Sequence, residues 1–256
     1  SQTSGYTSTS FSNQNYVFVF SGLETGKTYY VRPTVGLVGY VIPADQKLTL
    51  KEEGETTCPD SNHPHMIDLG LPSGTKWACC NVGATTPEGY GGYYAWGETS
   101  EKSVYNGVTY QYCTGTDSDG DGWYDSNKQY QNIGSDIAGT QYDVATVKWG
   151  SGWCLPSHAQ QVELVNNTTS EWTTVNGING RKFTGSNGGT IFLPAAGYRW
   201  DSDLGGVGSG GYYWSSSLFE SGPDQAWDLY FYSGNVDTDY GYYRYRGLSV
   251  RPVRKN

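Results

Sequence analysis

Charged residues are scarce in this chain of 256 residues, since they make up only 16% of it. An ordinary soluble domain contains roughly 25%. The 16 lysines and arginines are outnumbered by 25 acidic residues, which gives a formal net charge of −9. Phosphate backbones and anionic lipid headgroups repel such a protein. The composition therefore argues against nucleic acid and anionic membranes as partners.

Long apolar runs are absent as well. No segment approaches the ~20 consecutive apolar residues that a membrane-spanning helix needs. No basic segment followed by an apolar one opens the sequence, so we expect neither a membrane span nor a signal segment in this chain. The 23 tyrosines, 9 tryptophans and 7 phenylalanines can form a large core, which predicts a folded protein.

Cysteine and histidine do not form a familiar metal or disulfide pattern. The five cysteines include no C-x-x-C pair and no zinc-finger spacing. Two states stay open, a single disulfide between Cys80 and Cys113 or a set of reduced, buried thiols. The segment His63-Pro64-His65 falls where a linker is expected, which favours a solvated segment over a metal site.

Motifs of common enzymes are missing too. The sequence has no Gly-x-Ser-x-Gly elbow, no phosphate loop and no His-Glu-x-x-His motif. Cys154 and His158 lie four residues apart, but Pro156 and a helix start separate them, and no third residue is identifiable that would orient the pair. We therefore expect a protein that is not an enzyme.

The first 57 residues have the pattern of a small β-sandwich-like segment, with strands expected over 16–20, 29–32 and 47–50. Residues 23–32 resemble the entry to the penultimate strand of fibronectin type III modules, where a Leu precedes a Tyr by six residues. The segment is too short for a complete module and is predicted to be a partial one. Residues 58–65, rich in Pro, Asn and Ser, are predicted to be a linker.

Residues 66–256 are predicted to form a strand-rich domain of the α+β class with one or two short helices. A tight turn at 71–74 predicts a β-hairpin formed by 66–69 and 75–78. Ser157 and Gln160 have the spacing of a capping box and predict a helix with Val162 and Val165 facing inward. A second short helix is expected over 140–147, and short strands between glycine-rich turns are expected after residue 180.

The most specific chemical motif is the acidic segment 117–125, with the sequence DSDGDGWYD. Its spacing matches the first half of an EF-hand loop, in which alternating carboxylates and one backbone carbonyl bind Ca²⁺. Lys128 stands where a bidentate Glu closes the EF-hand shell, so Asp136 or water would have to complete it. The alternative is an acidic surface loop without metal. The predicted ligands of a structural calcium ion are Asp117, Asp119, Asp121, Trp123 and Asp125.

The C-terminal third is rich in Gly, Tyr and Trp. Alternation over 226–232 predicts a core face with Trp227, Leu229 and Phe231 and a solvent face that includes Asp228. Exposed aromatic rings beside carboxylates suit sugars or protein loops, whereas any single aromatic residue is more often core. The predicted binding face comprises Trp200, Asp201, Tyr212, Tyr213, Trp214, Tyr230, Tyr232, Asp237, Asp239, Tyr240 and Tyr242.

Several segments of the second domain together resemble a known family. They are IDLGLPSGTKWA at 67–78, NVGA at 81–84, YAWGE at 94–98, GWCLP at 152–156, FLPAAGYR at 192–199, YWSSS at 213–217 and GLSVRPV at 247–253. On these segments the chain is similar to the Fibrobacter succinogenes major paralogous domain, which is common in surface proteins of Bacteroidota. Departures include Cys79 and Cys154, where the family often has Thr and Arg.

This resemblance implies a C-type-lectin-like fold, distantly similar to formylglycine-generating enzymes and to variable ligand-binding proteins. No cysteine follows Cys154, which argues against formylglycine-generating activity. We expect a secreted or outer-membrane-associated cell-surface adhesion protein that binds a glycan or a protein. One alternative is an assembly subunit of a surface appendage such as a fimbrial tip, in contact with neighbouring envelope subunits. A second alternative is a carbohydrate-active enzyme with two carboxylates distant in sequence.

Overall fold

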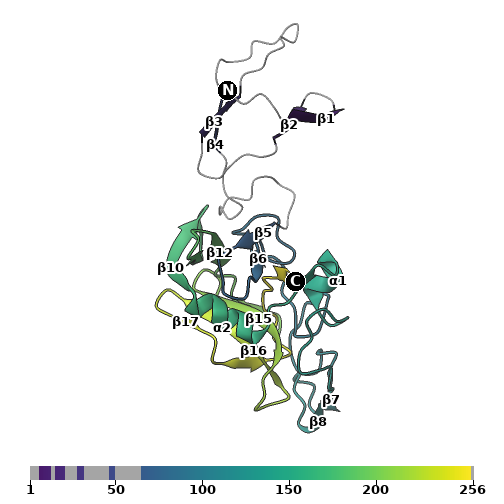
Figure 1. Cartoon of the computed structure of the whole chain (residues 1–256). Coiled ribbons are helices and arrows are strands. Elements are labelled where there is room, and N and C mark those ends of the chain that lie inside the picture. Colours follow the sequence, from purple (N-terminus) through teal and green to yellow (C-terminus); the bar gives the residue numbers. More distant parts are fainter. Residues whose placement is uncertain (1–5, 13–14, 21–27, 32–45, 50–64, 255–256) are drawn as a thin grey trace. The chain divides into compact units, whose positions relative to one another are not determined.

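The computed structural model describes residues 6–12, 15–20, 28–31, 46–49 and 65–254 and divides the chain into two units, Ser1–Glu52 and Glu53–Asn256. In the first unit, β1 (Tyr6–Ser12) pairs with β2 (Asn15–Phe20), and β3 (Thr28–Val31) pairs with β4 (Gln46–Thr49), both antiparallel (Figure 1). The three strands predicted here are thus confirmed within one residue. The fibronectin-like assignment stays a prediction, and the predicted linker, except His65, lies outside the described residues.

The second unit begins with the predicted hairpin. β5 (Met66–Asp68) pairs with β6 (Lys76–Ala78), and the amide of Gly74 donates to the carbonyl of Leu71 at 2.9 Å in the turn. The last strand, β19 (Val253–Arg254), pairs with both β6 and β9 (Trp153–Cys154). The two ends of this unit therefore close one four-stranded sheet.

Two short helices lie in the described residues. α2 (His158–Asn166) starts with the predicted capping box, in which Ser157 and Gln160 exchange side-chain and backbone hydrogen bonds. Its buried side chains are Gln161 and Leu164, so the predicted inward face is displaced by one residue. α1 (Val144–Trp149) confirms the second helix, although it starts later than predicted. Neither helix is long or apolar enough to cross a membrane.

Short antiparallel strands form the rest of the unit (Figure 1). The strand-rich α+β class is therefore confirmed. One sheet is the meander β10 (Thr168–Val175), β11 (Ile178–Gly185) and β12 (Thr190–Pro194). A second contains β15 (Gly210–Leu218), β16 (Gln225–Tyr232), β17 (Val236–Asp237) and β18 (Gly241–Tyr243). The unit also contains two separate two-stranded hairpins. They are β7 (Cys113–Thr116) with β8 (Ser126–Tyr130) and β13 (Tyr198–Trp200) with β14 (Asp203–Gly205).

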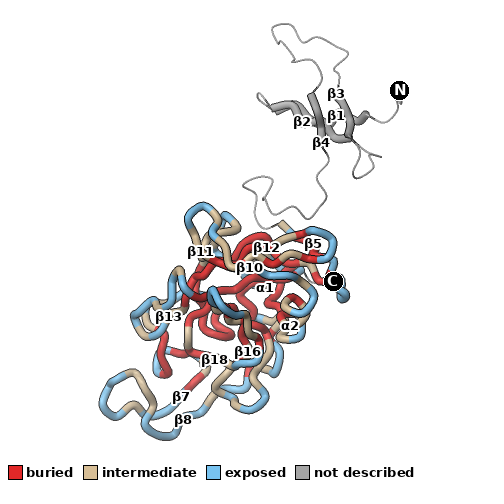
Figure 2. The backbone as a smooth tube through the Cα atoms, turned by 90° about the vertical axis from the view of Figure 1, so that its left-hand side faces the viewer, coloured by how far each residue is buried: buried red, intermediate tan, exposed pale blue. Residues whose placement is uncertain are grey.

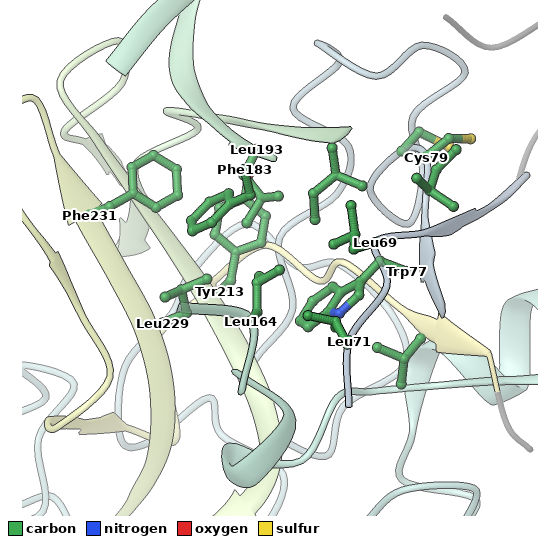
Figure 3. Close-up of a cluster of buried hydrophobic side chains, with 14 of the residues drawn as sticks. Leu69, Leu71, Trp77, Cys79, Leu164, Phe183, Leu193, Tyr213, Leu229 and Phe231 are labelled. Carbon is green, nitrogen blue, oxygen red and sulfur yellow. The ribbon is translucent and has the colours of Figure 1, made fainter. Parts of the chain in front are cut away.

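One apolar cluster joins these sheets and α2 (Figure 3). Trp77 of the opening hairpin, Leu164 of α2 and Phe183 of β11 are all buried in it. The backbone of Leu69 lies directly against Gly185. A Cβ at Gly185 would collide with the carbonyl oxygen of Leu69, so this position requires glycine. Buried segments fill the centre of the unit, whereas exposed segments, which include most of β8, lie at its periphery (Figure 2).

Buried charges also organise this core. The guanidinium of Arg251, a residue only 1% exposed, donates five hydrogen bonds. Their acceptors are the side chain of Asn81 and the backbone carbonyls of Ala78, Cys79, Pro87 and Phe192. Since these acceptors come from segments far apart in the sequence, one side chain fixes how the segments meet.

Asp143 is an anionic counterpart of Arg251. Its carboxylate accepts five hydrogen bonds while being fully buried before α1. The donors are the amides of Gly139, Ala145, Thr146 and Leu155 and the hydroxyl of Thr146. This carboxylate therefore both caps the helix and holds the segment that leads into β9.

Cys113 carries a free, buried thiol, so the disulfide between Cys80 and Cys113 that the sequence left open is not formed. Burial raises the pKa of this thiol, which disfavours the reactive thiolate.

Candidate functional site

Three tyrosines form a row on one face of the β15–β16 sheet. Tyr212 and Tyr230 face each other across the two strands, with ring centroids 4.6 Å apart and planes inclined by 29°. Tyr232 follows two residues along β16, and its ring centroid lies 5.8 Å from that of Tyr230. We call Tyr212, Tyr230 and Tyr232 the tyrosine row. Its exposure increases along β16, because Tyr230 is half-buried and Tyr232 is 42% exposed.

A second group of aromatic rings surrounds Arg246 beside this row. The guanidinium lies 4.2 Å from the ring centroid of Trp200 and within 5.7 Å of those of Tyr198 and Tyr242. Tyr198 and Tyr242 also contact Tyr212, at 5.0 and 5.5 Å between ring centroids. The row and the Arg246 group are thus one continuous surface, which we call the tyrosine face.

Arg246 is not fully hydrogen-bonded within the tyrosine face. Two nitrogens of Arg246, Nε and Nη1, are shielded from solvent and have no hydrogen-bond partner in the described residues. Burial raises the pKa values of Tyr212 and Tyr242, so their phenols stay neutral and able to donate. The sequence analysis missed Arg246. The only signal for it was an arginine within the aromatic-rich segment 240–246.

Acidic residues line part of this face. Asp237 is paired with Tyr230 across β16 and β17, and its Oδ1 accepts from the amide of Asp239 at 2.8 Å. Tyr240, in the same turn, is 65% exposed. Asp201 adopts a positive φ of 48° beside Trp200, and its backbone pairs with Tyr105. The structure thus joins Tyr230 to Asp237 through strand pairing and Trp200 to the tyrosines through Arg246.

The prediction that Tyr213 and Trp214 belong to the binding face is wrong, because each residue is only 1% exposed. The hydroxyl of Tyr213 donates to the carbonyl of Pro194 at 2.7 Å, and its ring stacks on Phe231 in the core. The indole nitrogen of Trp214 donates to the carbonyl of Tyr94 at 2.7 Å. Both side chains support the sheet from within, since contacts distant in sequence cover them.

Asp228 departs from the predicted alternation as well. It was placed on the solvent face, yet it is 1% exposed, and neither carboxylate oxygen has a hydrogen-bond partner in the described residues. Burial, and then the charge of Asp237, raise the pKa of Asp228 well above its ordinary value. The physical reason is β18, which pairs with β16 and packs Tyr242 over this face.

The acidic segment 117–125 connects β7 to β8, at the lower end of this unit in Figure 1. Asp117, Asp119 and Asp125 each offer an oxygen within 4.8 Å of the others. Ligands of one Ca²⁺ ion lie about 2.3–2.6 Å from it, and therefore at most about 5 Å from each other. The separation of these three carboxylates fits such an ion.

Backbone amides orient the carboxylates of this segment. Asp117 accepts from the amides of Gly120 and Gly122, and Asp125 accepts from the amide of Ser118 at 2.7 Å. Gly122 has a φ of +91°, and a Cβ there would collide with the side chain of Asn106. The loop is therefore set by glycine geometry and not by charge alone.

Asp121 is not part of the acidic group, and the carbonyl of Trp123 as a ligand stays a prediction. Oδ1 of Asp121 accepts from the amide of Trp123 at 2.9 Å, and the indole of Trp123 packs on Tyr245 with ring centroids 5.1 Å apart. Asp136 is also absent from the group, because its Oδ1 accepts from Ala138. Among the described acidic residues, three of the four predicted aspartate ligands converge.

The two described histidines, His65 and His158, contact groups of their own unit. The ring of His158 stacks on Trp227, with centroids 4.0 Å apart, and its Nε2 lies 2.9 Å from the carbonyl oxygen of Thr238. Nδ1 of His65 lies 3.8 Å from Sγ of Cys79. His63 lies outside the described residues.

Comparison with known proteins finds one family. Residues 155–253 match a family described as a domain of unknown function, DUF8237, which spans α2 and the whole tyrosine face and covers less than half of the chain. No curated protein and no solved structure matches this chain.

Proposed function

We propose that the second unit is a C-type-lectin-like ligand-binding domain of a secreted or cell-surface protein, and that its tyrosine face binds a glycan or a protein. One observation carries this proposal: half-exposed tyrosines are stacked on a sheet whose other face is core. Rigid aromatic rings with polar tips supply contact area at a low cost in conformational entropy. The domain binds its ligand and does not convert it chemically.

The supporting scaffold makes such a surface specific. Tyr212 and Tyr242 pack against the buried cluster that contains Trp214, so the rings have little freedom. Asp237 and Arg246 offer hydrogen-bonding groups of opposite charge beside the rings. A ligand with both apolar faces and hydroxyl or amide groups would match this combination.

We further propose that the acidic segment binds Ca²⁺ through Asp117, Asp119 and Asp125. The contact between Trp123 and Tyr245 supports a link to the tyrosine face, because Tyr245 also lies within 5.7 Å of Arg246. Calcium would neutralise three carboxylates and stabilise the loop that carries Trp123. Ligand binding should therefore weaken when calcium is removed.

The test is binding of the full chain to arrays of host and plant glycans and of extracellular proteins. One set of arrays contains millimolar Ca²⁺ and a second contains a chelator. Specific binding that decreases with the chelator is the expected result. Silence on every array would contradict the proposal and favour the assembly subunit, whereas turnover of a polysaccharide would favour the enzyme.

The calcium proposal has its own test by calorimetry. We expect saturable heat on titration of Ca²⁺, and Asp119→Asn should abolish it because one charged ligand is lost. Asp203→Asn, a change at an exposed aspartate of β14, is the matched control and should leave the titration unchanged. Absence of heat at millimolar Ca²⁺ would contradict the calcium site.

A further inference from the structure

A polar cleft lies at the base of the β7–β8 hairpin and uses none of the residues of the tyrosine face. Its volume is about 400 Å³, within the usual range of ligand sites. It is lined by Gln111, Tyr112, Gln131, Gln141 and Tyr142. We call it the glutamine cleft.

The two tyrosines of the glutamine cleft are held in place by the fold. The amide of Gln131 donates to the carbonyl of Tyr112 at 2.9 Å, which joins the two segments that flank the hairpin. The rings of Tyr112 and Tyr142 meet edge to face, with centroids 5.3 Å apart and planes at 87°. Both tyrosines pack against the buried cluster that contains Trp96 and Trp214. The aromatic part of the cleft is therefore preformed, whereas the three glutamines lie exposed around it.

Polar side chains that have no partner in the described residues surround this cleft, and its three glutamines are exposed to solvent. No side-chain hydrogen bond of the three glutamines or of the two tyrosine hydroxyls is formed within the described residues. Each carboxamide can donate two hydrogen bonds and accept at its oxygen. Three such groups offer donors and acceptors together, so the lining of the cleft is mainly polar.

The cleft carries no net charge, because its five lining side chains are neutral. Two charged residues that contact its backbone are engaged with other groups as well. Glu98 is paired with Lys102 and accepts from the backbone amide of Gln111. Arg244 is buried and donates to Tyr110, to the carbonyl of Pro223 and to the carbonyl of Gln131. A charged ligand would find no opposite charge among the lining side chains.

We propose that the glutamine cleft is a second binding site, and that its ligand is a neutral carbohydrate. Sugar hydroxyls both donate and accept, as carboxamides and tyrosine hydroxyls do, so a neutral sugar matches this polar lining. The volume suits one or two sugar residues. Because the site shares no residue with the tyrosine face, the proposal stands or falls independently of the function proposed above.

Nuclear magnetic resonance of the ¹⁵N-labelled full chain tests this directly. Neutral oligosaccharides of glucose, xylose, mannose and galactose are titrated singly to millimolar concentration while the glutamine side-chain amides are observed. At least one sugar should produce saturable shifts of Gln111, Gln131 and Gln141. The exposed Gln129 of β8 is the internal control and should not shift. No saturable shift with any sugar would overturn the proposal.

Variants then assign the binding to the cleft. Gln141→Ala should weaken the sugar about three- to tenfold, as expected for one neutral hydrogen bond, and adding Gln111→Ala should weaken it further. Gln129→Ala, at an exposed glutamine of β8, should leave the affinity unchanged. Gln111, Gln129 and Gln141 are all exposed, so the melting temperature of each glutamine variant should equal that of the wild type. Undiminished affinity of the double variant, or shifts caused by a neutral peptide and by no sugar, would overturn the proposal.

Discussion

Arg251 and Arg246 lie five residues apart in the sequence, yet they occupy opposite kinds of site. The guanidinium of Arg251 is buried and donates five hydrogen bonds to groups of its own domain. The guanidinium of Arg246 lies over Trp200 and leaves two nitrogens without a partner in the described residues. Arg251 joins segments of the scaffold. Arg246 lies among aromatic rings near the surface, and its guanidinium is only partly hydrogen-bonded.

This difference separates residues that stabilise the fold of the domain from residues that belong to its proposed binding surface. A buried charge whose bonds are satisfied internally stabilises the fold strongly, because removing it orphans its partners. A charge with buried atoms that lack partners adds less to stability, because their loss of hydration is not offset. The same contrast separates Asp143, which accepts five hydrogen bonds, from Asp228, which accepts none in the described residues.

The largest effect is expected for Arg251→Met. Methionine fills a similar volume but leaves four backbone carbonyls and Asn81 without their donor. The free energy of unfolding should fall by about 3–5 kcal/mol, the usual cost of breaking a buried charged network. Denaturant unfolding measures it. Arg254→Met, at an exposed arginine, is the control and should change stability little; equal effects would remove the contrast.

Asp143→Asn should cost somewhat less. Asparagine still caps a helix, but its NH₂ group cannot accept the hydrogen bonds that one carboxylate oxygen takes from Gly139 and Leu155. We expect a loss of about 2–3 kcal/mol in the free energy of unfolding, within the range for unsatisfied buried donors. Urea titration provides the value. A loss below that of an exposed Asp203→Asn change would mean that the buried network is not stabilising.

Arg246→Met should have the opposite profile to Arg251→Met. The stem of methionine can still pack on Trp200, so the free energy of unfolding should change by less than about 1 kcal/mol. Binding to a ligand found on the arrays should weaken about tenfold or more, as expected for a hydrogen bond to a charged group. Titration calorimetry and thermal melting measure the two quantities on one sample. Intact binding with lost stability would place Arg246 in the scaffold.

The only stabilising effect is expected for Asp228→Asn. The pKa of Asp228 is raised in the folded state, so the folded protein binds more protons than the unfolded one, and wild-type stability falls as pH rises from the ordinary aspartate pKa through the raised one. Asparagine removes this slope. The variant should match the wild type near pH 4 and exceed it at pH 8 in melting temperature. A wild type more stable than the variant at pH 8 would show that the carboxylate is paired.

Local chemistry allowed much of the fold to be predicted from the sequence. Ser157 and Gln160 are enough to locate the start of α2, because a capping box depends only on neighbours along the chain. The turn at Leu71 and Gly74 is likewise local. The three converging carboxylates of the acidic segment follow from spacing on a short loop held by Gly120 and Gly122.

Contacts distant in sequence account for what could not be predicted. Asp228 and Trp214 fit a half-exposed strand pattern, but β18 and the segment around Tyr94 return to cover them. The alternation of apolar and polar residues within β15 and β16 does not indicate that another segment covers one face of these strands. Arg246 escaped notice because its role depends on Trp200, which only the folded chain brings to it.

The central claim is that the tyrosine face binds a ligand while the groups beneath it hold the fold. Comparison of Tyr232→Ala with Tyr243→Ala tests it most directly, since the two rings are 42% and 40% exposed. Tyr243 stacks on Tyr245, whereas Tyr232 extends the tyrosine row. On the arrays with calcium, Tyr232→Ala should lose about tenfold or more in affinity at an unchanged melting temperature, and Tyr243→Ala should bind as the wild type does. Equal binding by both variants would contradict the claim.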